Sequence, residues 1–295
     1  MNKFFKVILL IGIVVVIFGG VLFGIAIGTR AFAKDEVVTK EELIEEIFNS
    51  FDIDVSISDI KFEKSDVNKV ACNERKKYYH DIKVENEKLV IRSQNNYKWY
   101  ENIIKFDFKP CTLTIYLTEE NYNSLTVKSS TGDIEVSDVF TFDSADITVS
   151  TGDVEFNANC LNDLNIKSST GDINVNGINN NSDIKLEAST GDIKIKDSNC
   201  KNLTLKASTG EITVDGTFVE KHIEIVTSTG DVMFVDADAD TLNVKTSTGD
   251  VRGNLKTDKT FETDTSTGKI SVPSGTTGGL CKIKTSTGDI KIVIK

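Results

Sequence analysis

Proline and histidine are almost missing from this sequence of 295 residues, which contains two of each. The apolar residues are mostly Ile, Val, Leu and Phe, and with so little proline this composition favours β-strands. The two histidines, His80 and His222, lie in segments that share no pattern. Hydrophobic residues make up 39% of the chain and charged residues 27%, which excludes a chain that is disordered by composition.

The usual motifs of catalysis and metal binding are missing too. The five cysteines show no C-x-x-C spacing, which leaves zinc or thioredoxin-like chemistry without support. No Ser/His/Asp order and no phosphate-binding loop is present. We therefore predict no catalytic residue, no cofactor-binding residue and no enzyme. Because the number of cysteines is odd, at least one thiol should be free or intermolecular outside the cell. The cysteines are Cys72, Cys111, Cys160, Cys200 and Cys281.

Positive charge is in deficit, since the formal net charge is -11 and the pI is about 4.8. An acidic surface repels the phosphate backbones of nucleic acids. We therefore expect no nucleic-acid partner.

Charge is absent altogether between Val7 and Thr29. At about 1.5 Å per residue, this run is long enough to span a hydrocarbon core of roughly 30 Å. Lys3 and Lys6 precede it, which weakly favours a cytoplasmic N-terminus. Residues 1–34 are thus predicted to be a transmembrane anchor of a single-pass protein whose bulk is extracytoplasmic. A cleaved signal peptide is the alternative, because residues 31–33 read Ala-Phe-Ala, a typical cleavage site.

Two segments separate this anchor from the repeats. Residues 35–51 are predicted to form an amphipathic helix, because apolar residues recur at helical spacing after a capping box that Thr39 and Glu42 would form. Residues 52–120 alternate polar and apolar residues without a fixed repeat, which predicts an irregular β-rich first portion.

Residues 121–295 repeat the tripeptide Ser-Thr-Gly nine times, at intervals of 19 or 20 residues. Apolar residues stand two and four positions after nearly every glycine, and five and seven positions before it. Each unit therefore consists of two alternating strands, and glycine supplies a backbone conformation at the turn that other residues resist. The structural turn glycines are Gly132, Gly152, Gly171, Gly191, Gly210, Gly230, Gly249, Gly268 and Gly288.

Two folds could use this unit. In a meander each Thr-Gly would be a hairpin, whereas in a parallel β-solenoid (β-helix) each would be a corner, with equivalent residues stacked about 4.8 Å apart. The even spacing and matched columns favour a solenoid of about nine coils. Its last strand ends at Lys295, so we expect this strand to form the end of the rod, with Lys291 and Lys295 protecting its edge.

These repeats resemble the bacterial putative-adhesin domain of unknown function, whose members carry repeats of the Ser-Thr/Ser-Gly-Asp-Ile type. The resemblance covers roughly residues 80–295 and includes the lead-in strand at 113–117, although Thr118 stands where the family commonly has proline. It implies a β-solenoid at the cell envelope, often anchored by one helix. It implies no catalytic residues.

One polar column follows the glycines, and it is acidic in eight of nine repeats, with Glu211 in one and Lys269 as the exception. Stacked carboxylates repel one another. Each could point into solvent or accept backbone N–H bonds, as aspartate does in turns. Alternatively the column could hold Ca²⁺ between coils, because hard cations prefer oxygen ligands. The calcium candidates are Asp133, Asp153, Asp172, Asp192, Asp231 and Asp250.

The sequence thus favours a non-enzymatic envelope protein, an adhesin-like module or scaffold that meets a surface glycan or a protein partner. A membrane-tethered accessory of an envelope-stress regulator is the alternative, and a polysaccharide-active enzyme is a third.

Overall fold

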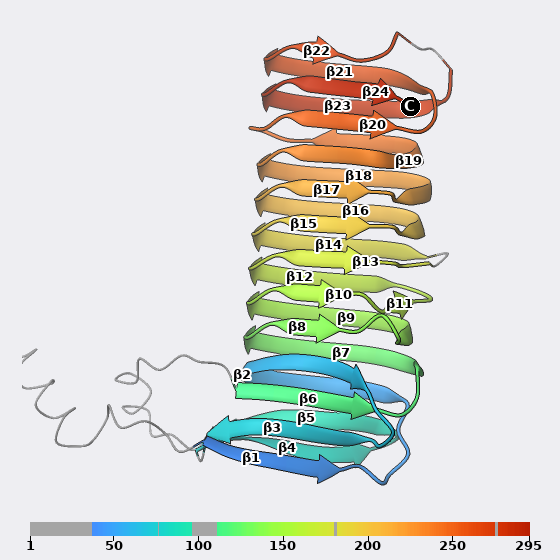
Figure 1. The fold of residues 1–295 in the computed structure, drawn as a ribbon. Helices are drawn as coiled ribbons and strands as arrows, with labels where there is room; N and C mark the ends of the chain where they lie inside the picture. Colours follow the sequence, from blue (N-terminus) through green and yellow to red (C-terminus); the bar gives the residue numbers. More distant parts are fainter. Residues whose placement is uncertain (1–36, 76, 96–110, 180–181, 275–276) are drawn as a thin grey trace, which may run out of the picture.

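The computed structural model describes residues 37–75, 77–95, 111–179, 182–274 and 277–295. The regular structure in these residues is β-strand throughout, wound into a parallel solenoid of about 8 turns, because nine glycine corners bound eight complete turns (Figure 1). The predicted anchor at 1–34 lies outside the described residues. Within the described ranges, no helix is long and apolar enough to cross a membrane.

Each turn of the repeat has a longer strand, a corner and a shorter strand. The longer strands are β7 (Asn121–Thr131), β9 (Thr141–Thr151), β12 (Leu164–Thr170), β14 (Asp183–Thr190), β16 (Asn199–Thr209), β18 (Phe218–Thr229), β21 (Lys259–Thr267) and β23 (Gly279–Thr287). The shorter strands are β8 (Ile134–Val136), β10 (Val154–Phe156), β13 (Ile173–Asn176), β15 (Ile193–Lys196), β17 (Ile212–Asp215), β20 (Val251–Leu255), β22 (Ile270–Ser271) and β24 (Ile290–Ile294). The strand β19 (Val232–Lys245) serves as both kinds, and β11 (Asn159–Cys160) adds a brief pairing with β9.

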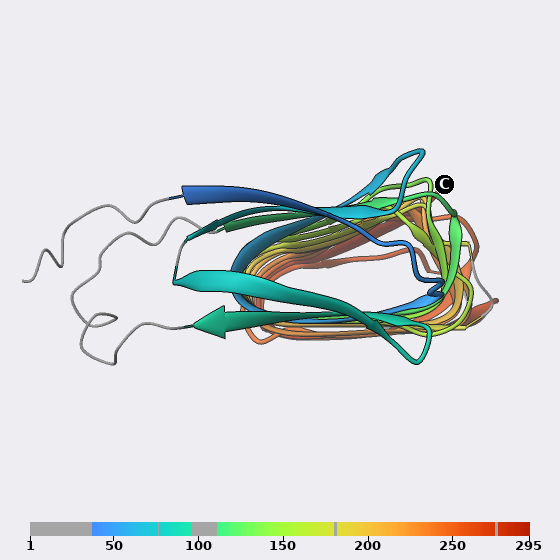
Figure 2. The same ribbon diagram turned by 90° about the horizontal axis from the view of Figure 1, so that it is seen from below.

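Longer strands stack on longer strands and shorter on shorter, in two parallel sheets that face each other across the core (Figure 2). Ile166 pairs with Ile147 on one side and with Leu186 on the other, so the predicted register of like on like is confirmed. The hairpin alternative would require antiparallel neighbours. The inward columns are almost fully buried, and each large apolar side chain removed from water contributes about 1.5–3 kcal/mol.

The corners bring backbone against backbone. At Gly191 φ is 139°, and a Cβ there would lie 2.1 Å from the carbonyl oxygen of Gly171 on the neighbouring coil. Eight of the nine predicted turn glycines have φ between 130° and 152°, and Gly268 is the exception. A side chain at these positions would be strained by φ and would also collide with the next coil.

The base of the rod is built differently. Its strands are β1 (Val37–Leu43), β2 (Ser50–Lys64), β3 (Lys69–Arg75), β4 (Tyr78–Glu85), β5 (Lys88–Asn95) and β6 (Cys111–Leu117). The first half of β2 pairs with β7 and its second half with β6 and β8, so β2 forms a coil that lacks the Ser-Thr-Gly signature. Below it, β3 and β4 run antiparallel to their neighbours.

The predicted helix at 35–51 is wrong. Its described part contains β1 and the first residues of β2. Strand β1 pairs with β3 over its whole length, from Val37 opposite Arg75 to Leu43 opposite Lys69. Pairing with a distant strand outweighs the local helical spacing, and of the apolar residues Leu43, Ile44, Ile47 and Phe48 at that spacing only Ile44 and Phe48 are buried.

The order of the coils at the far end differs from their order in the sequence. Strand β23 lies between β19 and β21, and β24 lies between β20 and β22 (Figure 1). The expectation that the last strand ends the rod is therefore wrong. Ile292 is 1% exposed, whereas Ile270 of the outermost coil is 46% exposed. That coil carries Thr263 in an otherwise apolar column, so placing it outside exposes less apolar surface.

This coil order predicts which engineered cysteines form a disulfide. Asn243 pairs with Lys282, and Glu262 lies one strand further out, opposite Lys282. Neighbouring strands are about 4.8 Å apart, within disulfide reach, whereas strands two apart are about twice that distance. The full-length Asn243→Cys/Lys282→Cys variant should therefore cross-link under mild oxidation, measured by the mass of tryptic peptides. The Asn243→Cys/Glu262→Cys variant should not, and the opposite result would restore the sequential order.

Candidate functional site

The acidic column runs along one corner of the rod as a ladder of hydrogen bonds between coils. The backbone N–H of eight of the nine members, all except Asp231, donates to the Oδ1 atom of the aspartate on the neighbouring coil, at 2.7–3.0 Å. A carboxylate that accepts a backbone N–H bond at an exposed corner relieves part of the repulsion within the column. The aspartates thus accept backbone bonds from the neighbouring coil, which is one of the two roles expected of them.

The sequence departs from the repeat pattern at both ends of this ladder, and the position at an end explains each departure. At the base, Asp59 on β2 accepts the bond from Asp133, although Ser58 stands where the repeats have glycine. At the far end, Lys269 donates its N–H to Asp289 and occupies the outermost coil. Among the described residues no further coil follows there, so no acceptor is needed at that position, and lysine replaces aspartate without loss of a bond.

The calcium candidates of the column stay a prediction. Each carboxylate already uses one oxygen for a backbone bond, except at the step from Asp231 to Glu211, where the Glu211 carboxylate binds the Thr213 hydroxyl instead. In the part of the chain that the structure describes, the group with three ligand atoms within 4.8 Å of one another lies elsewhere. It consists of Cys72, Glu74 and His80.

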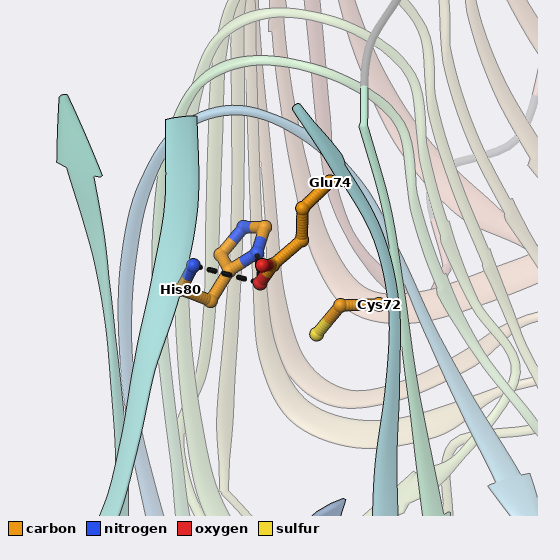
Figure 3. A group of neighbouring side chains, drawn as sticks. All are labelled: Cys72, Glu74 and His80. Atoms are coloured by element: carbon orange, nitrogen blue, oxygen red, sulfur yellow. Dashed lines mark hydrogen bonds and ion pairs between the residues drawn. The ribbon is translucent and has the colours of Figure 1, made fainter. Parts of the chain in front are cut away.

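This second site, the Cys72–Glu74–His80 cluster, lies inside the base (Figure 3). Cys72 and Glu74 are alternate residues of β3 and therefore share its inward face, whereas His80 lies on β4. The two strands pair only at Arg75 and Tyr78 and then diverge into separate sheets, β3 beside β6 and β4 beside β5. The three side chains consequently meet across the core, with residue exposures of 1%, 5% and 1%.

A chain of hydrogen bonds fixes the imidazole of His80. Its Nδ1 atom lies 3.0 Å from Oε1 of Glu74, which also accepts the His80 backbone N–H at 2.8 Å. The Nε2 atom lies 2.8 Å from Oγ of Ser58. The Tyr78 hydroxyl accepts the backbone N–H of Ile57 at 2.7 Å and lies 3.5 Å from the same Ser58 oxygen. Both ring nitrogens therefore have polar partners, as a buried imidazole requires.

Burial governs the protonation of the cluster. It lowers the pKa of His80, against the opposing effect of the Glu74 carboxylate, so the ring is neutral at pH 7. Burial and the same carboxylate raise the pKa of the Cys72 thiol to about 12. The group therefore brings together a thiol, a carboxylate and a neutral imidazole, all three on buried residues.

All five cysteines are buried and none is in a disulfide. Sequence reasoning missed the cluster because no C-x-x-C or similar spacing marks it. One signal was available: Glu74 continues the inward series of Val70 and Cys72, where a charged residue needs a partner. The partner His80 belongs to the opposite sheet, and no local pattern reveals that contact.

The model of the Toastrack DUF4097 family matches residues 48–293, most of the chain. The chain belongs to this family. The match confirms the resemblance to bacterial putative-adhesin domains of unknown function that the repeats indicated. No curated protein matches this Toastrack chain.

Solved structures agree on the fold. A putative adhesin from Parabacteroides distasonis has a TM-score of 0.56 at 16% identity, covering 88% of this chain and 98% of that one. A putative adhesin from Parabacteroides merdae has a TM-score of 0.55 at 15% identity, covering 88% and 96%. A putative lipid binding protein from Parabacteroides distasonis has a TM-score of 0.54 at 17% identity, covering 88% and 97%. At these identities the likeness shows the fold alone.

The ladder predicts a graded effect of removing carboxylates. Asp172→Ala should lower the free energy of unfolding by about 1–2 kcal/mol, because the Asp192 N–H loses its acceptor. Asp172→Asn should lose less, since its amide oxygen still accepts. Glu211→Ala is the matched control and should also lose less, because Glu211 binds a side chain rather than the next coil. Urea unfolding of the full-length protein measures all three, and equal losses would contradict the ladder.

The buried imidazole predicts a pH dependence. The pKa of His80 is lower in the folded protein than in the unfolded chain, so between the two values the unfolded chain binds more protons. The free energy of unfolding should therefore fall as pH drops through about 6.5, by at most about 1.4 kcal/mol per pH unit.

His80→Gln should remove this part of the fall, whereas His222→Gln, at an exposed position, should keep it. Urea unfolding of the full-length chain at pH 7.5 and 5.5, with a chelator present, tests the difference (both pH values are about one unit from the usual histidine pKa). The same pH dependence in the wild type and in His80→Gln would show that His80 is not the responsible group.

Proposed function

We propose that this Toastrack protein is a non-enzymatic component of the cell envelope, an adhesin-like module or scaffold that holds a rigid rod outside the membrane. The observation that carries the proposal is the continuous stack of filled coils, which share one apolar core from Ile44 to Ile292. At about 4.8 Å per coil, the repeats form a rod on the order of 40 Å long. A rod of this kind serves to hold a surface at a distance from its anchor.

The outer faces of the rod suit polar partners. A shallow groove of about 450 Å³ crosses several coils of the longer-strand sheet. Its lining includes charged side chains such as Lys167 and Glu187, which are paired at 3.3 Å, and hydroxyls such as those of Ser169 and Ser189. Rows repeated once per coil match a ligand that is itself extended, such as a surface glycan or a protein segment.

The buried base supports a non-enzymatic role. Ser58, His80 and Glu74 are linked in the order of a hydrolase triad, from hydroxyl to imidazole to carboxylate. However, Ser58 is 0% exposed, so a substrate could not reach its hydroxyl. The buried arrangement therefore favours a structural role for these three residues.

The extracytoplasmic location can be tested by labelling intact cells that produce the full chain. The native thiols are buried, so a membrane-impermeant maleimide should react mainly with an added cysteine at an exposed position, such as Lys194→Cys on β15. We expect equal labelling before and after lysis. The unmodified chain, with Cys200 buried on the next coil, is the control for background. Labelling only after lysis would place the rod inside the cell.

The adhesin-like part of the proposal needs a separate measurement. Cells that lack the chain should attach less to glycan-coated or protein-coated surfaces than cells that produce it. Replacing Lys167 and Lys206 at the groove with glutamate should lower attachment, because it reverses the charge of two residues that line the groove. The same replacement at Lys282 and Lys284, on a coil near the far end, is the control. Attachment that is independent of the chain would contradict an adhesin-like role, and the scaffold role would then be the remaining proposal.

A further inference from the structure

The Cys72–Glu74–His80 cluster has the composition of a metal site. It combines one sulfur, one oxygen and one nitrogen ligand, each from a buried residue, with the ligand atoms within 4.8 Å of one another. Ca²⁺ and Mg²⁺ prefer oxygen ligands alone, whereas Zn²⁺ accepts all three atom types. The cluster is separate from the acidic column, so it is independent of the calcium candidates.

The residues around His80 fix its imidazole in the way that a metal ligand requires. Ser58 Oγ lies 2.8 Å from Nε2, the ring nitrogen that faces away from the cluster. In metal sites, such a partner on the second nitrogen orients the ring and selects its tautomer. The Glu74 carboxylate accepts both N–H groups of His80 and a hydrogen bond from the Cys72 thiol, and a cation between the three residues would also compensate its buried charge.

We propose that Cys72 Sγ, a Glu74 carboxylate oxygen and His80 Nδ1 bind one Zn²⁺ ion, which joins the two sheets at the base of the rod. A water molecule or the second carboxylate oxygen completes four-coordination. Binding displaces one proton, from the Cys72 thiol to solvent. The imidazole proton moves from Nδ1 to Nε2, where Ser58 Oγ accepts it. The proposal does not depend on the function proposed for the rod.

A metal-bound link between the two sheets at the base has a structural reason. Elsewhere the two sheets are connected at every turn by a Thr-Gly corner that stacks on its neighbours. The base lacks a Thr-Gly corner, because Ser58 stands in the glycine position of β2. Below β2, the strands β3 and β4 pair with each other at one position only, Arg75 opposite Tyr78. A metal bound between β3 and β4 supplies the missing link between the sheets and therefore stabilises the end of the stack.

The test uses the full-length protein in detergent, stripped with a chelator and then titrated with Zn²⁺ or Co²⁺ alone. We expect one Zn²⁺ per chain by calorimetry, release of one proton per ion, and a thiolate-to-metal absorption band with Co²⁺. Cys72→Ala should abolish the band and weaken Zn²⁺ binding at least tenfold. Cys160→Ala, which removes a buried thiol on β11, separated from β2 by the strands β7 and β9, should change neither.

Two further variants keep the result decisive. Ser58→Ala should retain the band and weaken binding by about 10–100-fold, as loss of a partner on a ligating histidine does. Glu74→Gln should weaken binding while circular dichroism in chelator shows an intact fold, which covers the case in which Cys72→Ala fails to fold. Zn²⁺ binding that is equal in the wild type, Cys72→Ala and Glu74→Gln, or no binding by a folded wild type, would overturn the proposal.

Discussion

The solenoid depends on one contact, the approach of the backbone at each Thr-Gly corner to the carbonyl group of the corner below. At Gly191 a Cβ would lie 2.1 Å from the carbonyl oxygen of Gly171, which is less than any real contact of that kind. Only glycine stacked on glycine satisfies this geometry at coil after coil. The register of the whole stack follows, because once the corners are aligned the apolar columns meet in the core and each aspartate reaches the N–H of the next coil.

The same constraint explains why the two ends of the rod depart from the repeat. A coil at an end has a neighbour on one side only, so it can lose the residues that serve the missing neighbour. The outermost coil keeps Gly268 but carries Thr263 in the core column and Lys269 after the glycine. At the base, Ser58 offers its carbonyl group to Gly132 and needs no glycine itself, because the strand beside it on the other side, β6, begins opposite Ser58 at Cys111 and has no Thr-Gly corner.

The repeats could be predicted from the sequence because their evidence is itself periodic. Nine matched glycines and four apolar columns specify two strands, a corner and a parallel stack. The helix expected at 35–51 failed for a physical reason: the spacing of Ile44 and Phe48 fits a helix, but the pairing of β1 with β3 is a contact between distant segments. The prediction of the coil order failed for a similar reason. The departures at Thr263 and Lys269 were visible in the sequence, but the sequence does not reveal which strands lie next to each other.

The candidate site shows the same division. The acidic column was visible, and one of its expected roles, the acceptance of backbone N–H bonds, is found in the structure. The Cys72–Glu74–His80 cluster was not predicted, because it is assembled from two sheets and has no repeat to mark it. In a repetitive protein, therefore, the parts that periodicity cannot describe are where the structure adds most.

The central claim is that contact between corners, and not merely the unusual φ of glycine, fixes the stack. Gly191 and Gly177 separate the two effects: both have positive φ, but a Cβ at Gly177 would have its nearest neighbour 4.0 Å away. The decisive measurement is the free energy of unfolding of the full-length Gly191→Ala and Gly177→Ala variants, from urea denaturation. We predict a loss of about 1–2 kcal/mol for Gly177→Ala, the cost of positive φ alone, and a loss of more than twice that for Gly191→Ala. Equal losses would contradict the account.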